Sequence, residues 1–185
     1  MKIKMFVKSI VGFIRCFING IRWPSNGSVY LGSHIHVENG KKLNIESGVQ
    51  IRPYVDIFVH EEMHIGKGTD IGVRNRICGT VKIGNNVLIG PDNYISSVDH
   101  IYENIEKPIM AQGARNLYKN GHTVLCIGDD SWIGTHCAII GCVNIGKHCI
   151  IANSVVINDV PDYSVVAGVP ARVIKKYDVQ EQKWL

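Results

Sequence analysis

The residue whose type and position are best suited to chemistry is His100. It ends the run from Ile89 to His100, directly before a polar segment, residues 102–125, where a regular spacing of isoleucines breaks. An imidazole titrates near neutral pH and can take the proton from a hydroxyl group while a new bond forms. An isolated histidine would be interpreted as a solvated loop residue, but loops held on a rigid scaffold often carry reactive groups. We therefore predict that His100 is a general base.

The other histidines and the cysteines form no recognisable site. The six cysteines contain no CxxC pair, which indicates reduced thiols in a cytoplasmic protein rather than a zinc or disulfide framework. No metal is expected. The remaining histidines lack the spacing of metal ligands and are expected on the surface or in loops: His34, His36, His60, His64, His122, His136 and His148.

The elements that would position His100 are predicted by a six-residue repeat. Isoleucine recurs every six residues from Ile65 to Ile101 and again from Ile127 to Ile157, with a weaker run from Ile45 to Ile57. This period fits neither a 3.6-residue helix nor a hairpin meander, but it fits short strands and tight turns stacked in coils. Small or β-branched residues four places after the isoleucine are expected to form a second inward ladder: Thr69, Val81, Val87, Ser131, Cys137, Val143, Cys149 and Val155.

Length and composition indicate one globular domain. The chain has 185 residues, of which 45% are apolar and 19% charged, and its net charge of +4 gives no reason to expect nucleic acid as a partner. The coils are expected over residues 28–174, with an extruded loop at 102–125 and a short C-terminal helix or tail over 175–185. Residues 1–27 are expected to hold an amphipathic helix and a linker. This helix is expected to pack on the first coil, and the alternative is a peripheral contact with the inner face of the membrane.

Tandem isoleucine–glycine pairs resemble the hexapeptide repeat of the left-handed parallel β-helix acyltransferases. The run from Ile89 to His100 resembles the catalytic stretch of maltose and galactoside acetyltransferases and of the O-acetyltransferases that modify capsules and O-antigens. Two further runs, residues 127–135 and 152–175, are similar to later motifs of the same group. The resemblance covers residues 28–174. It implies an all-β, left-handed parallel β-helix, a triangular prism of hexapeptide coils that assembles as a homotrimer with active sites between subunits.

The resemblance also assigns roles to individual residues. His100 takes the place of the catalytic base, and Asp92 and Asp99 are the candidate substrate-binding residues, with Asp92 standing where relatives carry asparagine. Asp99, Glu103, Glu106 or a backbone carbonyl would orient the imidazole. Basic residues after the last coil suit the phosphates of a coenzyme. The expected contacts with acetyl-CoA, the acyl donor, are Trp132, Thr135, Ala152, Ile157, Asn158, Arg172 and Lys175.

Together these residues predict an acetyl-CoA-dependent O-acetyltransferase. Its acceptor would be a sugar hydroxyl of a polysaccharide, O-antigen or capsule precursor. No serine or cysteine with a neighbouring base is visible, so direct attack is expected rather than an acyl-enzyme. The alternatives are N-acetylation of an amino sugar, or acetylation of serine or an antibiotic. Beyond these stand a zinc-binding hexapeptide protein of the carbonic anhydrase type and a silent scaffold.

Overall fold

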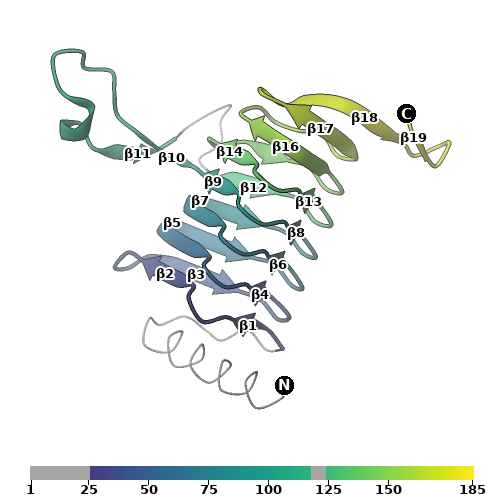
Figure 1. Cartoon of the computed structure of the whole chain (residues 1–185), viewed down its shortest axis with the longest axis horizontal. Coiled ribbons are helices and arrows are strands. Elements are labelled where there is room, and N and C mark those ends of the chain that lie inside the picture. The colour runs from purple at the N-terminus through teal and green to yellow at the C-terminus, as the bar shows by residue number, and fades with distance from the viewer. Residues whose placement is uncertain (1–25, 118–123) are drawn as a thin grey trace.

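The computed structural model describes residues 26–117 and 124–185, and these wind into a parallel β-solenoid (Figure 1). The predicted N-terminal helix lies outside the described residues. Among the described residues, no helix is long and apolar enough to cross a membrane. The all-β solenoid expected from the repeat is confirmed, whereas its left-handedness stays a prediction.

Each turn of the solenoid, here called a rung, passes through three faces. The first face contains β1 (Ser28–Val29), β4 (Gln50–Ile51), β6 (Asp70–Ile71), β8 (Leu88–Ile89), β13 (Trp132–Ile133), the start of β16 (Ile150–Val156) and β17 (Ser164–Gly168). The second contains β2 (His34–Val37), the first halves of β5 (Asp56–Ile65) and β7 (Arg76–Ile83), β9 (Tyr94–Ser96), β14 (Ala138–Ile140) and the end of β16. The third contains β3 (Lys42–Ile45), the second halves of β5 and β7, β12 (Leu125–Ile127) and β15 (Asn144–Ile145).

The isoleucine ladders fill the interior, as the spacing predicts. Equivalent isoleucines pair in register between rungs, for example Ile71 with Ile89 and Ile89 with Ile133, and these side chains are buried. The compact ladder is also inside, including Cys137 and Cys149, which confirms that these thiols are core residues. Burial of such apolar side chains is the main source of solenoid stability.

The predicted register is wrong at three positions. Ile157 is 40% exposed and Val155 lies on the outer side of β16, while Val156 and Ser154 point inward in their place. The chain takes five residues rather than six between the inward positions 151 and 156, which reverses the direction of each later side chain. Ile101 is likewise outside the core, because the chain has already left the solenoid after Ser97.

Buried asparagines support the corner between the first and second faces. Asn93 is 3% exposed; its amide donates to the carbonyls of Gly90 and Gly134 at 2.8 and 3.0 Å, and its carbonyl accepts the N–H of Cys137 at 2.7 Å. Asn75 repeats this arrangement one rung earlier. These side chains satisfy backbone groups that the sharp corner leaves without strand partners.

The interruption between the second and third faces of the fourth rung carries a hairpin. Strand β10 (Val98–His100) pairs antiparallel with β11 (Ala114–Asn116), and a 3₁₀ turn, η1 (Ile109–Ala111), lies between them. Residues 98–116, named the His100 hairpin, project from the side of the solenoid in Figure 1. Residues 118–123 lie outside the described residues.

The last residues are strands, not the predicted short C-terminal helix or tail. Strand β18 (Arg172–Asp178) pairs antiparallel with β17, and β19 (Lys183–Trp184) pairs with β18. The helix prediction was wrong because the free edge of β17 offers backbone partners to the following residues. Tyr177 and Trp184 then pack edge to face at 5.3 Å, and the solenoid ends in an antiparallel cap.

Candidate functional site

A continuous strip on the first face brings together four of the predicted coenzyme-binding residues. Trp132 pairs with Ile150, Ile150 with Val165 and Val165 with Lys175, so one row of outward side chains crosses four strands. A parallel row joins Ala152, Ala167 and Arg172. At about 4.8 Å per strand, Trp132 and Lys175 are about 14 Å apart along the sheet. The strip therefore leads from an aromatic ring, past small and apolar side chains, to two cations.

The outer side of this strip is unusually apolar for an exposed sheet. Leu88 pairs with Trp132, and these side chains are 50% and 49% exposed. Together with Ile150 and Val165 they form a row named the apolar ladder. Exposed contiguous apolar surface of this kind marks a binding surface for a ligand or another chain.

Asp92 and Thr135 lie at the corner that joins the first face to the second. The guanidinium of Arg74 donates to both carboxylate oxygens of Asp92, at 2.6 and 2.7 Å. This pairing holds the pKa of Asp92 below its ordinary value. The Thr135 hydroxyl donates to the Pro91 carbonyl at 3.0 Å, which fixes it beside the same corner. Asp92 is therefore a clamped, ionised side chain, separated from the His100 hairpin by strand β9.

His100 is exposed near the base of its hairpin. Its backbone N–H donates to the Asp99 carboxylate at 2.7 Å, so Asp99 bonds the strand rather than the imidazole. Glu103 pairs with Arg115 across the hairpin, and that hydrogen bond lowers the pKa of Glu103. None of the described residues forms a hydrogen bond with the imidazole. Of the predicted orienting groups, Asp99 and Glu103 have other partners.

The remaining predicted coenzyme contacts lie on another edge of the prism. Ile157 and Asn158 follow the second-face part of β16, at the corner between the second and third faces in the sixth rung. The His100 hairpin leaves the same corner in the fourth rung. The predicted site residues of one chain thus fall into two groups, here named half-sites: Trp132 with the basic strip on the first face, and His100 with Ile157 and Asn158 on the far corner.

Comparison with known proteins identifies relatives of this chain. No family model matches the sequence. The galactoside O-acetyltransferase of Escherichia coli is 33% identical over 140 residues, which cover 72% of this chain and 64% of that protein. A putative lipopolysaccharide biosynthesis O-acetyl transferase of the same organism is 28% identical over 177 residues, covering 89% and 82%. A galactoside acetyltransferase solved with coenzyme A superposes with a TM-score of 0.61 at 29% identity, over 76% of this chain and 66% of that one. This chain is therefore similar in sequence and in fold to sugar O-acetyltransferases.

The chain spans about half to four fifths of the length of the curated relatives that it matches. Among residues 26–117 and 124–185 no cluster of three metal-ligating side chains is present.

The sequence motifs indicated the residues of each half-site, but the partner of Asp92 was missed. Arg74 stands 18 residues before Asp92, and one rung of the regular repeat is 18 residues long. Pairs at this separation stack on neighbouring rungs of the regular repeat, as Asn75 and Asn93 also do, and this signal would have found it.

Proposed function

We propose that this acyltransferase transfers acetyl from acetyl-CoA to a sugar hydroxyl, with His100 as general base. The observation that carries the proposal is the strip on the first face. Its small side chains at Ala152 and Ala167 leave the sheet surface open to an extended thioester arm. Arg172 and Lys175, at its end, can pair with the coenzyme phosphates. The galactoside relative that superposes on this chain holds coenzyme A.

We propose further that each active site joins the half-sites of two copies. The His100 hairpin projects away from the strip of its own chain, on the other side of the solenoid (Figure 1). Its tip carries Ile105 and Met110, which are 97% and 96% exposed, while the apolar ladder is exposed on the opposite side. Two different surfaces that meet head to tail close into a ring, and a threefold ring is the simplest assembly that the family resemblance supports.

Rung heights agree with this assembly. In a ring whose axis runs along the solenoid, equal rungs of neighbouring copies face one another. The hairpin leaves the fourth rung and Trp132 lies in the fifth. Ile157, Asn158 and Ala152 all lie in the sixth. In this ring the two half-sites would therefore occupy neighbouring levels, with the hairpin starting one rung before Trp132.

The reaction would proceed by direct transfer. The His100 imidazole removes the proton of the acceptor hydroxyl as its oxygen attacks the thioester carbonyl carbon. A tetrahedral oxyanion forms and is stabilised by a backbone N–H. The carbon–sulfur bond then breaks, and the imidazolium returns the proton to the leaving thiolate. The products are an acetyl ester and free coenzyme A.

The test measures release of free thiol from acetyl-CoA with a panel of sugars, amino sugars, serine and antibiotics. We expect the wild type to prefer a sugar hydroxyl and His100→Ala to lose about 10²- to 10⁴-fold in kcat while still binding acetyl-CoA. The matched control is His36→Ala, which removes an exposed histidine from the first rung. Near-normal turnover by the His100 variant would refute the role of His100 as general base. Preference for an amino group as acceptor would show N-acetylation in place of the proposed O-acetylation.

A further inference from the structure

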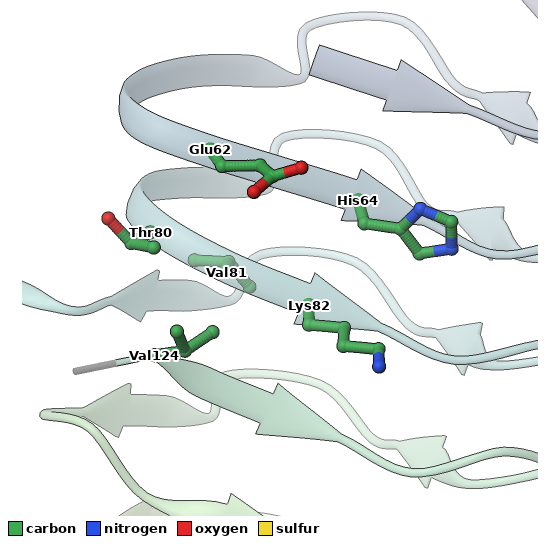
Figure 2. A pocket seen from close by; sticks show the side chains of 6 residues that line it. All are labelled: Glu62, His64, Thr80, Val81, Lys82 and Val124. Carbon is green, nitrogen blue, oxygen red and sulfur yellow. The ribbon is translucent and has the colours of Figure 1, made fainter. Parts of the chain in front are cut away.

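A hollow on the third face lies beside the foot of the His100 hairpin. Its volume is about 360 Å³, and it is lined by Glu62, His64, Thr80, Val81, Lys82 and Val124. Figure 2 shows Glu62 and His64 on β5, Lys82 on the next strand, β7, and Val124 at the start of β12. Val124 supplies apolar surface among these polar groups, whereas Val81 is buried in the core.

The hollow exists because one rung has a short corner. Val59 on β5 pairs with Gly79 on β7, and Met63 on β5 pairs with Val81 on β7. Three residues, 60–62, lie between the two partners on β5, whereas only Thr80 lies between the two partners on β7. The third rung therefore lacks two residues that the second rung has. Gly79 has a φ of +101°, and a Cβ there would overlap the Ser97 hydroxyl, so the short corner is drawn tightly inward. This leaves a notch in the edge of the prism.

The notch is tied directly to the hairpin that carries the base. The Thr80 N–H donates to the Ser97 hydroxyl at 2.7 Å, and the Ser97 carbonyl accepts the N–H of Leu117 at 2.7 Å. Ser97 stands three residues before His100, a separation of at most about 10 Å along an extended chain. A molecule in the notch would thus lie next to the foot of the strand that presents His100.

Two charged side chains of the notch are available to a ligand, whereas His64 pairs with Glu46 at 3.3 Å. Neither Lys82 nor Glu62 forms an ion pair with another described residue. The Thr80 hydroxyl and the Asn116 side-chain carbonyl, both buried at the foot of the hairpin, have no hydrogen-bond partner among the described residues. Buried polar atoms are nearly always satisfied, so such exceptions call for an explanation.

We infer that this notch is the acceptor subsite and that it binds one neutral sugar ring. The inference rests on the proposed function, because it places the acceptor of that reaction. A sugar ring presents hydroxyls that both donate and accept, and an apolar face of C–H groups. Glu62 can accept from adjacent hydroxyls, Lys82 can donate to a ring or hydroxyl oxygen, and Val124 can contact the C–H face. An acceptor with a net charge would leave either the carboxylate or the ammonium poorly matched.

The experiment compares Lys82→Ala and Glu62→Gln with Lys42→Ala, which removes an exposed lysine from the same face in the first rung, two rungs before Lys82. We expect each notch variant to raise the KM for the sugar acceptor by about 10- to 100-fold, since each loses a hydrogen bond to a charged group. The KM for acetyl-CoA and the value of kcat should stay within about twofold. Notch variants that behave like Lys42→Ala would overturn the inference, and so would a parallel rise in both KM values.

A second measurement separates this inference from the proposed function. Saturation-transfer NMR with a panel of methyl glycosides reports binding whether or not acetyl is transferred, and Thr80→Trp fills the notch. We expect at least one glycoside to bind the wild type and the Lys42 variant but not the Thr80 variant. Binding that survives Thr80→Trp refutes the notch. Tighter binding of an anionic sugar phosphate, lost in Lys82→Ala but not in Glu62→Gln, refutes the neutral ring.

Discussion

Replacing Asn93 by alanine tests whether the buried asparagines stabilise the corner beside the strip on the first face. The side chain makes three hydrogen bonds, to the carbonyls of Gly90 and Gly134 and from the N–H of Cys137. The Gly90 carbonyl keeps a second donor, the Asn75 amide at 2.8 Å. The substitution therefore leaves two buried backbone groups without this partner. At about 1–3 kcal/mol for each, the free energy of unfolding should fall by about 2–6 kcal/mol.

That loss is a large part of the 5–15 kcal/mol by which a domain is typically stable. It is measured by urea unfolding at one fixed protein concentration, followed by tryptophan fluorescence, as a lower midpoint with an unchanged slope. The control is Asn44→Ala on the outer side of β3, where the side chain is exposed and a change within about 0.5 kcal/mol is expected.

The isosteric variant Asn93→Asp gives the same test a pH signature. Its carboxylate would face the carbonyls of Gly90 and Gly134, so burial and these dipoles should raise its pKa in the folded protein. The variant should then be most stable below the ordinary carboxylate pKa of about 4 and lose stability as pH rises through the raised value. If Asn93→Ala is as stable as Asn44→Ala, or Asn93→Asp shows no such trend, the asparagines do not support the corner.

Two further predictions use the other described groups. Because Arg74 lowers the pKa of Asp92, their pair should stabilise the fold above about pH 4 and lose this effect as pH falls through the lowered value. The difference in thermal midpoint between the wild type and Asp92→Asn should therefore shrink on acidification from pH 5 to 2.5. A difference that stays constant would contradict this prediction. Burial raises the pKa of the Cys126 and Cys142 thiols, so both should react slowly with a disulfide reagent at pH 8. The partly exposed Cys126 should react first, as measured by mass spectrometry of the labelled peptides.

Much of the scaffold could be predicted from local spacing. A six-residue period requires equivalent side chains to stack, and it therefore identified the inward isoleucines and the buried Cys137 and Cys149. It failed where the period itself changed. One residue fewer after Ile151 turned Ile157 outward, and the free edge of β17 drew the C-terminal residues into strands. Neither effect has a local signature, because each depends on which backbone groups remain unpaired after the coils have stacked.

The sequence by itself determined the solenoid, the interruption after the second face of the fourth rung, and the residue types that could take part in a reaction. Only the tertiary structure decided where those residues lie relative to one another. Stacking at one rung per 18 residues joined Arg74 to Asp92, and stacking together with the antiparallel cap joined Trp132 to Lys175. The same stacking placed His100 on the opposite edge from the strip. It also made the notch, since a shorter corner leaves space only when longer corners lie above and below it. The physical reason is that these relations are contacts between rungs, which no single stretch of chain contains.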